Sequence, residues 1–120
     1  MSEQTLFDAS GSPIAYIADD GETIYLWDGH AVAYLVEDKV YGWNGKHLGW
    51  FTRKTMFDQS GRPVGYLRSA CPRATYAEPA KYAKYAKYAK YARYAAYARP
   101  ALTSSPSATS LPDFLRTGSV

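Results

Sequence analysis

The 120-residue chain has a single cysteine, and this scarcity limits the chemistry open to it. Cys71 has no second thiol for an intrachain disulfide and no Cys/His cluster around it that would hold structural zinc. A lone thiol is typical of a reducing compartment. The first residues lack a basic region followed by an apolar run, and no stretch approaches the roughly 18 apolar residues of a membrane-spanning helix. We therefore expect a soluble, cytoplasmic protein of about one domain.

Groups that carry catalysis are also few. His30 and His47 follow turn glycines, with no Ser, Asp or Cys partner at a suggestive spacing, so both are expected to be exposed turn residues. The chain has no phosphate-binding glycine motif. Two acidic runs lack the ordered ligands of a calcium loop and are interpreted as solvated loop acids: Asp19, Asp20 and Glu22, and Glu37 and Asp38. The sequence predicts a protein that is not an enzyme and uses no cofactor or metal.

Acidic residues are scarce in the second half of the chain. Residues 71–120 carry eight Lys/Arg against Glu78 and Asp113, whereas residues 1–70 carry six Lys/Arg against nine Asp/Glu. The net charge of +3 therefore conceals an acidic N-terminal module joined to a basic tail. A partner recognised by charge is expected at the tail.

What the sequence has in abundance is internal repetition. Four units can be aligned on Gly11, Gly29, Gly45 and Gly61. An aromatic residue stands four positions before each glycine, and an aliphatic, a small, an aromatic and an apolar residue stand three to six positions after it. In unit order these positions hold Phe7, Tyr25, Tyr41 and Phe57; Ile14, Val32, Leu48 and Val64; Ala15, Ala33, Gly49 and Gly65; Tyr16, Tyr34, Trp50 and Tyr66; and Ile17, Leu35, Phe51 and Leu67.

Each unit is predicted to be a β-hairpin. Asp28-Gly29 and Asn44-Gly45 are strong hairpin signals, because both residue types accept the positive φ of a tight turn. One hairpin is marginally stable in water, so the four must pack together. We expect an all-β fold over residues 5–70, a small closed pseudo-four-fold barrel without exposed edges. A flat meander with one buried face is the alternative.

Alternation along the second strand of each unit separates two faces. The aliphatic and the aromatic residues share one face, and the small and the final apolar residues share the other. If the four strands converge near an axis, a side chain larger than alanine would clash at the small position. The aromatic residue at one fixed place in each unit suggests a shallow site for a hydrophobic or lipid-like ligand.

The four units are of two kinds in the order A-B-B-A. Units one and four share Phe-Asp-x-Ser-Gly-x-Pro, and units two and three share Tyr-x-Trp-Asp/Asn-Gly. In a closed ring this order gives one side with Trp27 and Trp43 and another with Asp8 and Asp58. The candidate ligand-binding residues are therefore Tyr16, Tyr34, Trp50, Tyr66, Trp27 and Trp43.

The unit strings TIYLWDGHAVAYL (residues 23–35) and VYGWNGKHLGWF (residues 40–51) resemble those of the bacterial 4-fold β-flower proteins. The resemblance covers residues 5–70 and implies a shallow barrel whose hairpins splay like petals. SLPDFL at residues 110–115 is similar to the close of such proteins, which carry a lysine-rich repetitive stretch before it. The resemblance implies no established activity and no known binding residue.

The basic tail (residues 71–100) repeats Ala-Lys-Tyr from Ala80 onward, between Pro79 and Pro100. A three-residue step gives an α-helix no apolar stripe, whereas polyproline II would align one Lys, one Tyr and one Ala edge. Because Ala, Lys and Arg are good helix formers, a helix or a helix–coil mixture of about 20 residues is favoured. Polyproline II or disorder is the alternative. A Ser/Thr/Pro linker (101–110) and a short apolar anchor (111–120) follow.

Cations interleaved with aromatic rings suggest a second function, in which the tail binds a polyanion. Lysines can neutralise phosphates while tyrosines stack on bases or enter a lipid headgroup layer. A low-complexity expansion packed along the acidic barrel is the alternative. The two functional hypotheses are a non-enzymatic binding module and an adaptor tethered to anionic membrane or nucleic acid, with a monomeric barrel favoured. The candidate polyanion-binding residues are Lys81, Lys84, Lys87, Lys90, Arg93 and Arg99.

Overall fold

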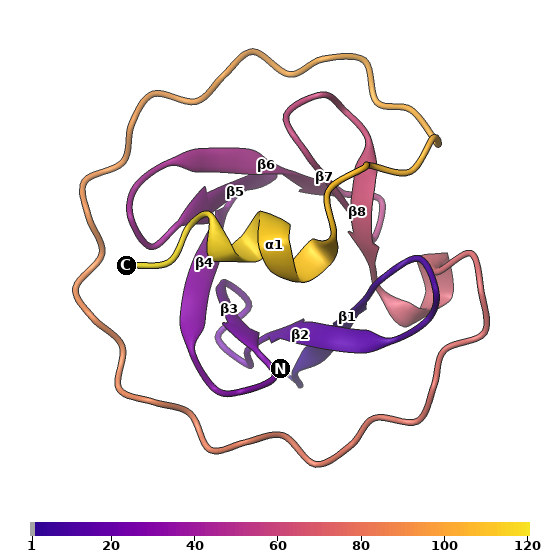
Figure 1. Ribbon diagram of the computed structural model, residues 1–120. Coiled ribbons are helices and arrows are strands. Elements are labelled where there is room, and N and C mark those ends of the chain that lie inside the picture. The colour runs from indigo at the N-terminus through magenta and orange to yellow at the C-terminus, as the bar shows by residue number, and fades with distance from the viewer. Residues whose placement is uncertain (1) are drawn as a thin grey trace.

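The computed structural model describes residues 2–120 and has eight antiparallel strands in one closed barrel (Figure 1). Each strand pairs with the next along the chain, and Phe7 pairs with Tyr66 to join the last strand to the first. The closed barrel is confirmed, and the flat meander is wrong. The strands are β1 (Gln4–Phe7), β2 (Pro13–Ile17), β3 (Thr23–Leu26), β4 (Ala31–Val36), β5 (Lys39–Gly42), β6 (His47–Thr52), β7 (Thr55–Phe57) and β8 (Pro63–Tyr66).

Each repeat unit forms one hairpin, here called a petal, whose turn lies at the rim of the barrel. Gly29 and Gly45 have φ of 97° and 88°, a region that favours glycine. The side chains of Asp28 and Asn44 accept the N–H two residues further on, at 3.0 and 3.1 Å. Local turn chemistry therefore closes the petals, as the sequence predicts.

The prediction that the aliphatic and aromatic residues of each second strand share one face is wrong, because every petal contains a β-bulge. In the first petal Leu6 pairs with Ala15 and Phe7 with Pro13, so Ile14 is an extra residue. The same irregularity recurs in the other three petals. The extra residue breaks the alternation, so that Val32, Leu48 and Val64 join the core beside the small residues. The aromatic residues Tyr16, Tyr34, Trp50 and Tyr66 lie outside that core cluster.

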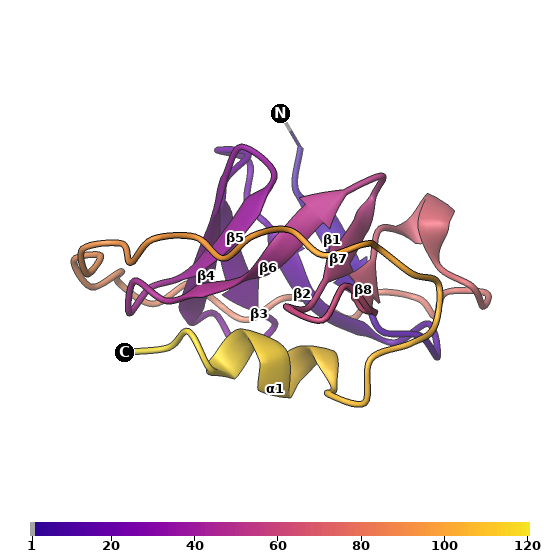
Figure 2. The same cartoon turned by 90° about the horizontal axis from the view of Figure 1, so that it is seen from above.

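One end of the barrel is closed by the short helix α1 (Leu111–Arg116), which lies across it (Figure 2). The Ser110 side chain caps the helix by accepting the N–H of Asp113 at 3.3 Å. Leu111, Phe114 and Leu115 are buried in the same core as the barrel residues. The apolar cluster expected at the end of the chain is therefore part of the barrel's own core.

The small residues in the repeat have a different cause from the one expected. A Cβ added at Gly65 would lie 2.8 Å from Leu111 Cδ1, and one at Gly49 would lie 3.1 Å from Phe114 Cζ and closer still to the Phe57 carbonyl. These glycines leave room for α1 as well as for a neighbouring strand. Convergence of the four strands on an axis does not by itself explain them.

The helix favoured for the tail is wrong. Beyond the 3₁₀ turn η1 (Arg68–Ala70), residues 71–110 contain neither helix nor strand. They run extended around the barrel, at mid-height in side view (Figures 1 and 2). Helix propensity is overridden because the backbone of this segment bonds to the petals and not to itself. We call residues 74–109 the belt.

Candidate functional site

The belt is held to all four petals by the same contact, repeated every nine residues. The backbone N–H of Tyr76, Tyr85, Tyr94 and Thr103 donates to the carbonyl of the turn glycine in petals one to four, at 2.9 to 3.0 Å. Three Ala-x-x triplets therefore span one petal.

The turn glycines also provide the space in which the belt lies. A Cβ at Gly29 would lie 2.1 Å from the Ala83 carbonyl oxygen, and one at Gly45 would lie 2.1 Å from that of Ala92. Ala74 and Ala101 stand in the same way over Gly11 and Gly61. Glycine is thus required at each petal tip both for its φ and for the approach of the belt.

A signal for this register is present in the sequence. Alanine occupies every third position from Ala74 to Ala101, a frame that runs through Pro79 and Pro100 without a break. The Ala-Lys-Tyr run is the part of this frame that is easiest to see. The length of this alanine frame, divided over the steps from the first petal to the fourth, would have indicated that the belt passes each petal in nine residues.

The belt cations point toward the barrel at the junctions between petals. Between petals one and two, Lys81 Nζ lies 5.0 Å from the centre of the Tyr16 ring, and Lys84 Nζ lies 5.2 Å from that of Tyr25. The same arrangement recurs nine residues later. Lys90 Nζ lies 4.2 Å from the centre of the Tyr34 ring, and Arg93 Cζ lies 5.7 Å from that of Tyr41. These are cation–π contacts.

Glu3 strengthens the first of these junctions. Its carboxylate lies 3.3 Å from Lys81 Nζ and 2.9 Å from Lys84 Nζ. Burial alone would raise the pKa of Glu3, but the two ammonium groups outweigh it and hold that pKa below its ordinary value. Burial raises the pKa of the neighbouring Tyr16 hydroxyl. The barrel thus offers the belt a carboxylate and aromatic faces together.

The structure does not gather the predicted ligand-binding aromatics into one ring. Each lies in a separate cross-strand pair between petals: Tyr16 with Tyr25, Tyr34 with Tyr41, Trp50 with Phe57 and Tyr66 with Phe7. Trp27 and Trp43 stand edge-on against Tyr16 and Tyr34, at 5.8 and 5.5 Å. Belt cations lie over the first two of these pairs, whereas Arg68, which precedes the belt, lies 4.9 Å from the centre of the Phe7 ring in the last.

Five of the six predicted polyanion-binding residues contact the barrel. Lys81, Lys84, Lys90 and Arg93 lie over the aromatic pairs, and Arg99 Nη1 lies 3.0 Å from Asp38 Oδ2. Among residues 2–120, Lys87 is the member of this set without an ion pair or a cation–π contact. Most of the belt cations therefore pack against the barrel, an arrangement that the sequence suggested only as an alternative.

The expectation that both histidines are exposed turn residues is wrong for His47. His30 is exposed as predicted and stacks on Tyr85 with ring centres 4.1 Å apart, but His47 is only 2% exposed. The belt lies over it, and its Nδ1 accepts the backbone N–H of Tyr97 at 3.0 Å. A turn residue is buried here because a segment 50 positions away in the chain covers it.

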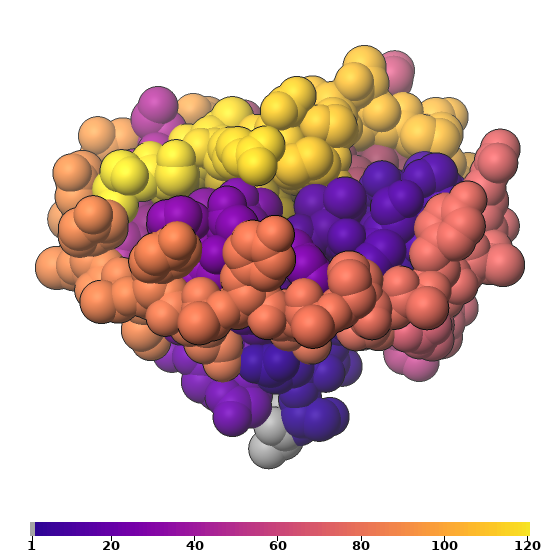
Figure 3. Space-filling view, turned by 60° about the horizontal axis from the view of Figure 1, so that its bottom comes forward, coloured from indigo at the N-terminus to yellow at the C-terminus, as the bar shows by residue number. Residues whose placement is uncertain are grey.

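The tyrosines of the belt point away from the barrel and form what we call the tyrosine girdle. On the face seen in Figure 3, the belt forms a raised band across the surface of the molecule. The girdle tyrosines are 58% to 71% exposed, which is unusual for so many large aromatic residues. The girdle consists of Tyr76, Tyr82, Tyr85, Tyr88, Tyr91, Tyr94 and Tyr97.

A groove of about 520 Å³ lies between the first two petals, the belt and α1. Pro13, Ile14, Leu26 and Trp27 form its barrel side, and the belt contributes Pro79 and Tyr82. Trp27 Nε1 is buried and has no hydrogen-bond partner within residues 2–120, whereas the equivalent Trp43 Nε1 donates to the Tyr88 carbonyl at 2.6 Å.

Residues 2–120 contain neither a cluster of metal-ligating side chains nor a helix that could span a membrane. No group of three or more His, Cys, Asp or Glu side chains in this part of the chain is placed to hold a metal ion. Neither α1 nor the 3₁₀ turn has the length and apolar character of a membrane-spanning helix.

Comparison with known proteins identifies the family. No curated protein and no solved structure matches the chain. The family model described as "4-fold beta flower protein" matches residues 4–115. That span includes the belt and most of α1, so the family pattern extends well beyond the four petals. The chain belongs to the 4-fold beta flower protein family.

Proposed function

We propose that the protein is a non-enzymatic module that binds single-stranded nucleic acid along its tyrosine girdle. The tyrosine girdle is the main support for this proposal. Its seven exposed rings are spaced three or six residues apart along an extended backbone. Aromatic side chains on such a path can stack on successive bases of any sequence. A cytoplasmic location would bring RNA within reach.

The path of the girdle supports a flexible linear ligand over a flat one. The belt runs around the circumference of a molecule with extents of 37 × 37 × 25 Å (Figure 1). A flat bilayer would touch only one arc of such a ring. A single strand can bend to follow it and contact many tyrosines at once.

The charge of the belt supports a polyanionic ligand. Residues 74–109 carry six Lys/Arg against Glu78 alone. Cation–π contacts with the barrel do not remove the charges of Lys90 and Arg93. Lys84 and Arg99 are paired with carboxylates of the barrel but keep 39% of their side-chain surface exposed. Phosphates bound near the girdle would release counterions, so affinity should fall as salt rises.

Replacing Tyr82, Tyr88 and Tyr91 together by serine should weaken binding of a fluorescent oligothymidine by at least about 100-fold, because each lost stack is worth about 1–3 kcal/mol. Fluorescence anisotropy at low and moderate salt measures this. These rings are exposed, so the unfolding free energy should change little.

The matched control replaces the same three tyrosines by phenylalanine, which keeps the stacking faces and should bind within a few-fold of the natural chain. Loss of binding in both variants would contradict stacking. Binding to phosphatidylserine vesicles without binding to the oligonucleotide would assign the girdle to a membrane surface instead.

A second candidate function, binding of a hydrophobic or lipid-like ligand, is favoured by the groove beside Trp27. Its lining is largely apolar, and Trp27, whose buried Nε1 has no hydrogen-bond partner among residues 2–120, forms part of its wall. Adding a lysophospholipid should then change the tryptophan fluorescence. The change should be lost in Trp27→Phe and kept in Trp43→Phe. An unchanged signal in the natural chain, with no bound lipid in native mass spectrometry, would eliminate this candidate.

A further inference from the structure

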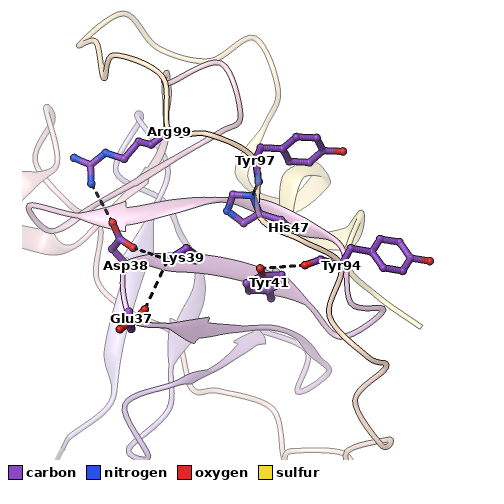
Figure 4. A network of polar contacts seen from close by, with 8 residues as sticks. All are labelled: Glu37, Asp38, Lys39, Tyr41, His47, Tyr94, Tyr97 and Arg99. Carbon is purple, nitrogen blue, oxygen red and sulfur yellow. Dashed lines mark hydrogen bonds and ion pairs between the residues drawn. The ribbon is translucent and has the colours of Figure 1, made fainter.

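Three side chains of the second and third petals hold the belt between Tyr94 and Arg99 (Figure 4). The Tyr41 hydroxyl donates to the Tyr94 carbonyl at 3.2 Å, and Asp38 pairs with Arg99. Between these two contacts, His47 Nδ1 accepts the Tyr97 N–H at 3.0 Å. We call this group the clasp.

The histidine bond requires one particular state of the imidazole. Because Nδ1 accepts a hydrogen bond, it carries no hydrogen of its own. The imidazole is therefore neutral, with its one N–H at Nε2. That Nε2 is buried, and no hydrogen-bond partner for it exists in the described part of the chain, residues 2–120. A protonated ring would carry a hydrogen on Nδ1 as well and would have to give up the Tyr97 N–H.

The surroundings of His47 oppose its protonation. The rings of Tyr41, Trp50 and Tyr97 surround it, with centres 4.7 to 5.9 Å away. Burial lowers the pKa of His47, and the Lys39 ammonium adds to this effect, while Asp38 and a backbone contact at Gly49 act the other way. Asp38 is shared with Lys39 and Arg99, at 3.6 and 3.0 Å.

The other charged or titratable groups near His47 do not supply a new partner for a proton. The belt contributes Tyr94, Tyr97 and Arg99, β5 contributes Lys39 and Tyr41, and Lys46 precedes His47 in its own hairpin. Gln59, from the β7–β8 turn, donates to the His47 carbonyl and not to its ring.

No other petal has a histidine at the position of His47. The positions equivalent to His47, two residues after the turn glycine, hold Pro13, Ala31 and Pro63. Titratable side chains also contact the belt at other petals: His30 stacks on Tyr85, Glu3 pairs with Lys81 and Lys84, and Asp58 accepts the Ser107 hydroxyl. Among residues 2–120, none of these three groups accepts a backbone N–H of the belt, as His47 does. His47 is therefore the titratable group whose protonation would break a backbone hydrogen bond of the belt, and that bond is the Tyr97 N–H.

We propose that His47 makes the hold on the belt pH-dependent at the third petal alone, so that protonation of its imidazole releases belt residues 95–99. The direction in which belt opening changes with pH follows from the linkage between proton binding and opening. The ring binds a proton more readily when the belt has lifted than when the belt covers it. Opening is therefore rare above the ordinary pKa of 6.5 and becomes more frequent as the pH falls below it. One proton gives at most about a tenfold change in the opening equilibrium per pH unit.

Amide hydrogen exchange on the full chain tests this proposal. The protection factor of the Tyr97 amide, from which the intrinsic pH dependence of exchange has been divided out, should be constant above about pH 7 and fall by up to about tenfold per pH unit below about 6.5. The Tyr76 and Thr103 amides, bonded to Gly11 and Gly61, should keep constant protection and serve as internal controls.

His47→Asn is the matched variant, because its Oδ1 can accept the Tyr97 N–H and does not titrate. Its Tyr97 protection should not depend on pH. A constant Tyr97 protection in the natural chain would overturn the proposal, and so would a parallel loss at Tyr76 and Thr103, which would indicate acid unfolding of the whole belt. The comparison of amides within the natural chain stands even if the variant does not fold.

Discussion

Gly29→Ala should lower the free energy of unfolding by roughly 3 kcal/mol, whereas Gly21→Ala should lower it by only about 1–2 kcal/mol. Both glycines have positive φ, 97° and 76°, so both substitutions place an alanine in the left-handed region. At Gly29 the new Cβ would also lie 2.1 Å from the Ala83 carbonyl oxygen, and the belt must move or the petal must distort. Gly21 lies in the turn between β2 and β3, away from the petal tips.

Chemical denaturation measures the two free energies, and limited trypsin digestion measures release of the belt, which is rich in lysine. Gly29→Ala should be cut within residues 81–93 faster than Gly21→Ala. Equal losses of stability and equal cleavage at the two glycines would mean that the belt does not press on the petal tip.

Leu111→Ala should lower the unfolding free energy by about 2–5 kcal/mol, because it empties part of the core where α1 closes the barrel. Gly65→Ala should also destabilise, by about 1–3 kcal/mol, because its Cβ would meet the Leu111 side chain at 2.8 to 3.0 Å. The double variant should be more stable than the sum of the two losses predicts, by about 1–2 kcal/mol, because the added methyl group enters the space that Leu111 vacates.

Gly49→Ala is the control for this cycle. A Cβ there would lie 2.0 Å from the Phe57 carbonyl oxygen, a backbone atom that no side-chain truncation removes. Phe114→Ala should therefore not rescue Gly49→Ala. Strict additivity of Leu111→Ala and Gly65→Ala would show that α1 does not occupy the space left by the small residue.

The barrel was predictable because its turn and strand signals are local in the sequence and recur in four repeat units. Asp28-Gly29 and Asn44-Gly45 specify hairpin turns by themselves, and the repetition implies that the hairpins pack as equivalents. The faces of the strands were not predictable in the same way. One extra residue at Ile14, Val32, Leu48 and Val64 changes which side chains reach the core, and strict alternation has no place for it.

The belt was mispredicted because intrinsic propensity was the strongest local signal. Alanine and lysine favour a helix, while the acceptors that stabilise the extended form are petal carbonyls such as that of Gly45, far away in the chain. The absence of an apolar stripe correctly argued against a docked helix. The burial of His47 and the inward direction of Lys90 depend on the same long-range contacts and were missed for the same reason.

The nine-residue register has a consequence for how this chain can vary in length. Tandem Ala-Lys-Tyr triplets are the kind of repeat that gains or loses copies easily. Here the circumference of the barrel sets the number of triplets between Tyr76 and Thr103. Removal of one triplet would leave the belt too short for its last anchor or shift every later residue by a third of a petal. The copy number is therefore constrained by geometry, although the composition reads as low complexity.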